Sequence, residues 1–163
     1  ANLLSAVRCG MLDIVLVKRE VGGDTGISVC QEPLMWVGSV AYPITDMATT
    51  LPLAVFPEGC AYRTRALDVL EAQGRQWRVT YTSSSLTGIQ AAVLGGLGIS
   101  VLPKSALLPG HKVLNGEVGF PVLPDIELAL HVASRGQTKV WDRLIEYILE
   151  RVKAGLPPMS SWH

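Results

Sequence analysis

The segment from residue 51 to 103 constrains the fold most, because short apolar runs alternate there with helical patterns. The runs at 51–57, 77–82 and 98–103 are rich in β-branched and aliphatic residues, which predicts strands. A helical face is predicted between the first two runs, at about 61–73, and a second helix between the last two carries Ile89, Ala92, Val93 and Leu97 on one side. Glycines at 95, 96 and 98 are expected to close that second helix. This alternation predicts an α/β fold built on parallel sheet.

The same pattern continues on both sides of this segment. Further strands are predicted at 13–19, 32–39 and 126–134, and the first of them is apolar enough to be buried on both faces of a sheet. A short helix is expected before the first strand, and an amphipathic helix at about 139–154. Two proline-containing passages, near 43–52 and 121–124, are expected to be crossings between two lobes.

Bulk composition narrows the class of protein. The 163 residues are 48% hydrophobic and 17% charged, which is typical of a folded globular chain. Fourteen basic residues balance fourteen acidic ones, so the chain lacks the basic surface that binds nucleic acid without sequence preference. No run of eighteen apolar residues is present, which argues against a membrane span.

Cysteine usage and the first residues bear on location. Cys9, Cys30 and Cys60 form no C-x-x-C pair and no zinc-ligand spacing, so we expect no metal site and a reducing cytoplasm. The start "ANLLSAVRCG" has neither an initiator Met nor a signal sequence. We therefore expect a piece of a longer polypeptide.

A run of hydroxyl side chains is the first candidate site. Thr82, Ser83, Ser84 and Ser85 follow a predicted strand and precede a helix, whose free N-terminal amides attract anions. Together they would suit a small acid at the carboxyl end of a sheet. The alternative is that Ser84 or Ser85 caps the helix and the other hydroxyls are solvated turn residues. Both readings stay open at this point.

Two further strand ends could contribute to the same crevice. Gly59 and Cys60 lie at a second strand-to-helix junction, where backbone amides could point toward a ligand. A redox role for Cys60 is the alternative, although no cysteine partner is near in sequence. Arg63 is interpreted as a solvated helix residue. Lys18 or Arg19, at the end of the strand at 13–19, could also face the crevice, with plain solvent exposure as the alternative.

Enzymatic motifs are not found. The turn "TSSSLTG" lacks the first glycine of a G-x-S-x-G nucleophile elbow. The cluster "GGLGIS" ends a predicted helix, whereas a dinucleotide-binding fingerprint opens one. No acid/base pair for hydrolysis is evident. We therefore expect no enzyme and no cofactor.

Two motifs in order resemble a known family. "GMLDIVLV" at 10–17 and "AAVLGGLGISVLP" at 91–103, with the segments around them, are similar to the effector-binding domain of LysR-type transcriptional regulators. "GCAYRTRALD" and "WRVTYTSSSL" suggest a subgroup related to regulators of motility and virulence.

This resemblance implies a fold like type 2 periplasmic binding proteins, with two Rossmann-like lobes joined by two crossovers. One lobe would comprise residues 1–50 and 124–163, incomplete at its N-terminus, and the other residues 51–123. A small-molecule effector would bind in the cleft between them. The carried-over contacts are Lys18, Arg19, Gly59, Cys60, Thr82, Ser83, Ser84, Ser85, Ile99 and Ser100.

The resemblance also implies partners. The whole protein would be a cytoplasmic homodimer or homotetramer that meets DNA only through a winged helix-turn-helix absent from this chain, with no membrane partner. The alternative is the solute-binding protein of a transporter, which has the same fold. An enzyme on this fold would need the acid/base pair that the sequence does not show. Nothing in the sequence identifies the effector.

Overall fold

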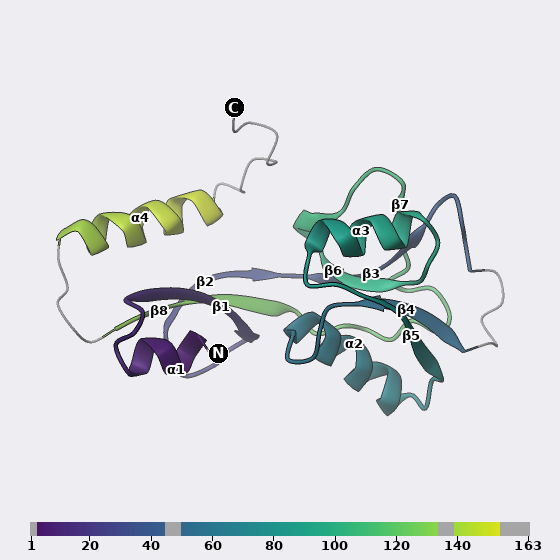
Figure 1. Ribbon diagram of the computed structural model, residues 1–163, viewed down its shortest axis with the longest axis horizontal. Coiled ribbons are helices and arrows are strands. Elements are labelled where there is room, and N and C mark those ends of the chain that lie inside the picture. The colour runs from purple at the N-terminus through teal and green to yellow at the C-terminus, as the bar shows by residue number, and fades with distance from the viewer. Residues whose placement is uncertain (1–2, 45–49, 134–138, 154–163) are drawn as a thin grey trace. The chain divides into compact units, whose positions relative to one another are not determined.

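The computed structural model describes residues 3–44, 50–133 and 139–153. The chain divides into two compact units, unit 1 at 1–31 and 126–163 and unit 2 at 32–125, so it crosses between them twice (Figure 1). The elements are α1 (Leu3–Arg8), β1 (Ile14–Glu20), β2 (Ile27–Glu32), β3 (Leu34–Ser39), β4 (Leu51–Val55), α2 (Ala61–Ala72), β5 (Trp77–Thr82), α3 (Leu86–Leu94), β6 (Ser100–Pro103), a 3₁₀ turn η1 (Lys104–Ala106), β7 (His111–Val113), β8 (Ile126–Val132) and α4 (Lys139–Lys153).

Unit 1 contains a three-stranded sheet in the order β1-β8-β2. β1 and β8 pair antiparallel over seven residues, from Ile14 opposite Val132 to Glu20 opposite Ile126. Val15 of β1 is buried in a small cluster with residues of α1 and of the chain after β8. Leu16, which points to the other face, is 37% exposed. The expectation that this strand is buried on both faces is therefore wrong, because side chains alternate along it and α1 packs against one face.

Unit 2 contains a mixed sheet. β4 and β5 are parallel neighbours, and β3 pairs antiparallel with β6 and β7. A parallel bridge between Leu53 and Ile99 joins the two sets, so the strands run in the order β5-β4-β6-β3-β7. The prediction of parallel sheet is correct only where a helix connects the strands. β3, in contrast, pairs antiparallel with both of its neighbours, β6 and β7.

The glycine cluster ends α3 as predicted. Leu97 N–H donates to the Ala92 carbonyl at 2.9 Å and Gly96 N–H donates to the Val93 carbonyl at 3.0 Å, with Gly96 at φ +75°. These two bonds and the left-handed glycine define a Schellman C-cap. Leu97, which was expected on the buried face, lies beyond the cap and is 52% exposed.

The lobe limits predicted at 50/51 and 123/124 differ from the limits of the compact units, which fall at 31/32 and 125/126. β3, assigned to the first lobe in the prediction, pairs within unit 2. Residues 45–49 of the predicted crossing lie outside the described part of the chain. Among the helices that the structure describes, none has the length and apolar character needed to cross a membrane.

Candidate functional site

Two strand-to-helix turns meet at one edge of the unit 2 sheet. Val55, the last residue of β4, lies opposite Thr82, the last residue of β5, and Ser83 N–H donates to the Val55 carbonyl at 3.2 Å. Because the strands are parallel, the turn at 56–60 and the turn at 82–85 leave the sheet side by side. The structure therefore brings together six of the predicted contacts: Gly59, Cys60, Thr82, Ser83, Ser84 and Ser85.

The three serines differ in what they contact. Ser85 is the N-cap of α3, and its Oγ accepts a hydrogen bond from Gly88 N–H at 3.3 Å. Ser83 Oγ accepts from Ser85 N–H at 3.1 Å. Thr82 and Ser84 are exposed. Capping thus accounts for Ser85, and since Ser83 and Ser85 accept in these bonds, their own O–H groups remain able to donate to a ligand.

The neighbouring turn presents the start of α2. Gly59 has φ +82°, a conformation that glycine adopts at low cost, and Cys60 is the N-cap residue without a side-chain bond to the helix amides. Arg63, interpreted from sequence as a solvated residue, instead folds back on this turn. Its Nη1 donates to the Phe56 carbonyl at 3.3 Å, and its Nη2 lies 3.7 Å from Glu58 Oε1. Its side chain is only 17% exposed, so it adds positive charge close to the turn.

Tyr62 anchors the first turn of α2. Its side chain is buried, and its ring lies 5.6 Å from that of Phe56, centroid to centroid. Burial raises the pKa of the Tyr62 hydroxyl far above its usual range, with smaller contributions from the charges of Glu32 and Cys60. Tyr62 therefore stays neutral and serves as packing beneath the turn.

Arg19 is held by other residues of unit 1. Its Nε donates to Glu127 Oε2 at 2.7 Å, and its Nη1 donates to the Thr25 carbonyl. Ser28 donates to the other oxygen of Glu127. The hydrogen bonds from Ser28 and then Arg19, together with the charge of Arg19, lower the pKa of the Glu127 carboxyl. Lys18, the adjacent strand residue, is exposed on the opposite face.

Ile99 and Ser100 lie inside the sheet. Both are almost completely buried, at 1% and 2% exposure. Ile99 is level with Leu53, in the middle of β4, and not with its carboxyl end. The structure therefore does not bring these two residues to the edge that carries the serines, and their part in effector binding stays a prediction.

Metal-ligating side chains do not cluster in the described ranges. Within 3–44, 50–133 and 139–153, no three His, Cys, Asp or Glu side chains gather in a way that could hold a metal ion. None of Cys9, Cys30 and Cys60 takes part in a disulfide. The candidate edge carries hydroxyls, backbone amides and a guanidinium beside one exposed carboxylate, Glu58, and these donors suit an anion better than a cation.

Comparison with known proteins gives relatives over almost the whole chain. HTH-type transcriptional regulator PecT of Dickeya dadantii (strain 3937) is 28% identical over 161 residues, covering 99% of this chain and 51% of PecT. DgdR of Burkholderia cepacia, also an HTH-type transcriptional regulator, is 29% identical over 158 residues, covering 96% of this chain and 51% of DgdR. The chain thus spans about half the length of these relatives.

Solved structures show the same fold at low identity. The regulatory domain of HypT from Salmonella typhimurium in its bromide-bound form matches with a TM-score of 0.74 at 14% identity, over 93% of this chain and 78% of that one. The regulatory domain of CcmR from Synechocystis PCC6803, in complex with 2-PG, matches with a TM-score of 0.68 at 16% identity, over 96% and 80%. These likenesses confirm the predicted α/β fold class.

The model of the LysR substrate binding domain matches residues 1–153, which include both motifs that carried the resemblance. The chain belongs to the LysR substrate-binding domain family.

Proposed function

We propose that this chain is the effector-sensing part of a LysR-type transcriptional regulator, and that its effector is a small acid bound at the turns 56–60 and 82–85. The observation that carries the proposal is the meeting of two helix N-termini at one sheet edge, with hydroxyls between them. PecT and DgdR are named as transcriptional regulators, and the CcmR domain was solved with a small molecule. These names favour a regulator over the solute-binding protein of a transporter and over an enzyme.

The chemistry of the edge favours a negatively charged ligand. The first-turn N–H groups of a helix lack intrahelical partners, and the helix dipole adds partial positive charge there. α2 and α3 each present such an end, and Ser83 and Ser84 can donate from between them. Arg63 adds a guanidinium near the first turn, whose positive charge is partly offset by Glu58 at 3.7 Å. A carboxylate would therefore gain several hydrogen bonds to charged or dipolar donors at this edge.

The remaining predicted contacts belong to the same proposal. Lys18 or Arg19 would contribute from unit 1, and Ile99 and Ser100 from the interior of unit 2. The lobes would be residues 1–50 with 124–163, and residues 51–123. For signalling, the effector must bind one arrangement of the lobes more tightly than the other, since equal affinity would shift no equilibrium. The protein would act in the cytoplasm as a homodimer or homotetramer, with DNA bound by a segment outside this chain.

The test is a thermal-shift and calorimetry screen of the whole chain with small carboxylic acids, each paired with its uncharged amide. We expect at least one acid to raise Tm and bind with micromolar to millimolar Kd while its amide does not. Ser84→Ala should weaken binding of that acid about threefold to tenfold, as loss of one solvent-exposed hydrogen bond does. Ser105→Ala is the matched control, since Ser105 is exposed elsewhere in unit 2. Equal binding of acids and amides would contradict the anion site.

A further inference from the structure

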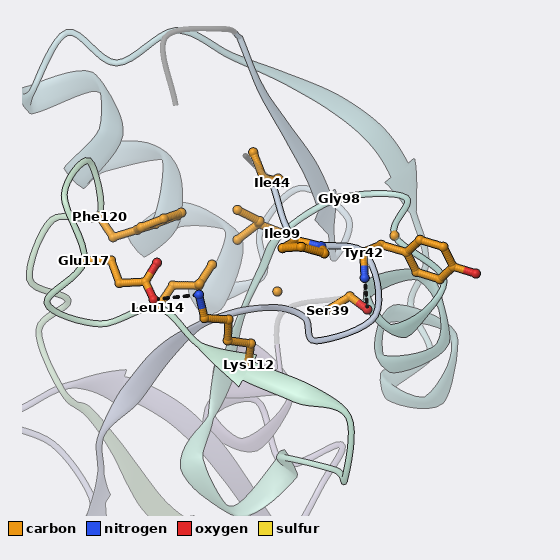
Figure 2. Close-up of a pocket in the computed structure, with 12 residues that line it drawn as sticks. Ser39, Tyr42, Ile44, Gly98, Ile99, Lys112, Leu114, Glu117 and Phe120 are labelled. Atoms are coloured by element: carbon orange, nitrogen blue, oxygen red, sulfur yellow. Dashed lines mark hydrogen bonds and ion pairs between the residues drawn. The ribbon is translucent and has the colours of Figure 1, made fainter. Parts of the chain in front are cut away.

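A pocket in unit 2 is separate from the serine edge. It is a small cavity of about 30 Å³ and lies between the end of β3, the start of β6, and the segment from β7 to Phe120 (Figure 2). β3 and β6 are antiparallel with Val37 opposite Ser100, so Gly38 lies opposite Ile99. Ile99 in turn is level with Leu53, whereas the serine turn follows the last residues of β4 and β5. The pocket therefore lies toward the opposite end of these strands.

The inner wall of the pocket is apolar and already shaped. Ile99, Leu114 and Phe120 line it, each under 9% exposed. Leu114 packs closely against Gly38, where a Cβ would lie 3.1 Å from Leu114 Cδ1. Phe120 is held by Trp36, with ring centroids 5.7 Å apart. A small apolar group could enter without rearrangement of these side chains.

The mouth of the pocket carries one charge of each sign. Lys112 Nζ lies 2.9 Å from Glu117 Oε1, and the two side chains are 44% and 45% exposed. Both line the pocket and their pair is drawn in Figure 2. An ion pair this exposed contributes little to stability, so its partners can be exchanged for those of a ligand at small cost. A ligand with a single charge would satisfy one of the two side chains and leave the other without its partner.

We propose that this pocket binds a small apolar α-amino acid, with its carboxylate on Lys112, its ammonium on Glu117 and its side chain against Ile99, Leu114 and Phe120. The zwitterion matches the net-neutral pair at the mouth, and the apolar wall matches a short branched side chain. This site is additional to the effector site proposed above and uses none of its serines. The small cavity, about 30 Å³, favours a ligand the size of valine over an aromatic amino acid.

The test is calorimetric titration of the whole chain with L-valine and three probes that each lack one feature. L-Alanine shortens the side chain, 3-methylbutanoate lacks the ammonium, and 2-methylpropylamine lacks the carboxylate. We expect L-valine to bind at one site and each of the other three to bind at least threefold more weakly. Lys112→Gln and Glu117→Gln should each reduce the affinity for L-valine threefold to tenfold. Because both substituted residues are exposed, neither variant should disturb the fold.

The control is Ser84→Ala, which should leave L-valine binding unchanged. No detectable binding of L-valine, equal binding of 3-methylbutanoate, or full affinity in Glu117→Gln would each overturn the proposal. If Ser84→Ala reduces L-valine binding to the same extent as the pocket variants, the amino acid occupies the serine edge and the pocket assignment is wrong. Failure of the acid screen at the serine edge would leave this result unaffected.

Discussion

Replacing the three consecutive serines one at a time should separate their structural contributions. Ser85→Ala removes the N-cap bond to Gly88, and Ser83→Ala removes the bond to Ser85 N–H. N-cap substitutions cost about 0.5–2 kcal/mol, and the length of the Ser85 to Gly88 bond, 3.3 Å, puts this one near the lower end, at about 0.5–1 kcal/mol. Ser83→Ala should cost about the same. Ser84 is exposed, so Ser84→Ala should change stability by less than about 0.5 kcal/mol.

The assay is urea unfolding followed by circular dichroism, together with amide hydrogen exchange at Gly88. If the cap opens locally, the loss of about 0.5–1 kcal/mol corresponds to Gly88 exchange that is about twofold to fivefold faster in Ser85→Ala. Ser84→Ala provides the matched control, because it changes the same residue type in the same turn. Its Gly88 exchange rate should equal that of the unmodified chain.

The relative loss of stability in the three variants tests which serines are structural. If Ser84→Ala were as destabilising as Ser85→Ala, or if Gly88 exchange were unchanged in Ser85→Ala, the division of the turn into structural and ligand-facing hydroxyls would be refuted. If Ser84→Ala lowered the stability of the fold, its effect on effector binding could not be assigned to the lost hydroxyl alone.

Three further outcomes are expected. Gly98→Ala should lower the free energy of unfolding in urea by about 1–3 kcal/mol, because its Cβ would lie 2.8 Å from the Pro52 carbonyl oxygen. Gly74→Ala should lower it less, because only the left-handed backbone (φ +63°) opposes a side chain there. Burial and, to a smaller extent, nearby arginines lower the pKa of His131 below its ordinary 6.5. The unfolded chain therefore binds more protons than the folded chain, and Tm should fall as pH drops through 6.5. His131→Gln should reduce this dependence of Tm on pH. Because the pKa of Glu127 is lowered, the stability that its carboxylate contributes is present above pH 4.5, the ordinary pKa of the group, and is lost as the pH falls below that value. Urea titrations across that pH range should show no such loss in Glu127→Gln.

Local patterns were sufficient for most elements of unit 2. β5 was predicted with its observed bounds, and α2 and β4 within one or two residues, because each has a periodic apolar pattern that ends at a turn signal. β2 and β7 were missed. Only Val29 of β2 is buried, and β7 is three residues long, so neither has an apolar pattern from which a strand could be predicted.

The candidate site was predicted in part. The two turns could be placed at one edge because parallel strands end together, and the structure confirms that pairing. The position of Arg63 could not be predicted, since it depends on Phe56 and Glu58 in the turn before the helix. The pocket was not anticipated either. Its walls come from segments more than ten residues apart, and Leu114 and Phe120 lie in a stretch with no clear periodicity.

The glycines of the motif at 91–103 show why some features are visible in sequence and others are not. Gly96 is needed for its left-handed backbone, and its place after a helical apolar pattern makes that need predictable. Gly98 is needed for space against β4, where Ile99 N–H donates to the Pro52 carbonyl at 2.8 Å, and nothing local to the motif indicates this neighbour. The close approach fixes Ile99, whose side chain lines the pocket, while the other end of β4 leads to the turn beside the serines. The family motif therefore builds the sheet on which both proposed sites depend, whereas Ser84 at one end and Lys112 at the other lie outside the motif.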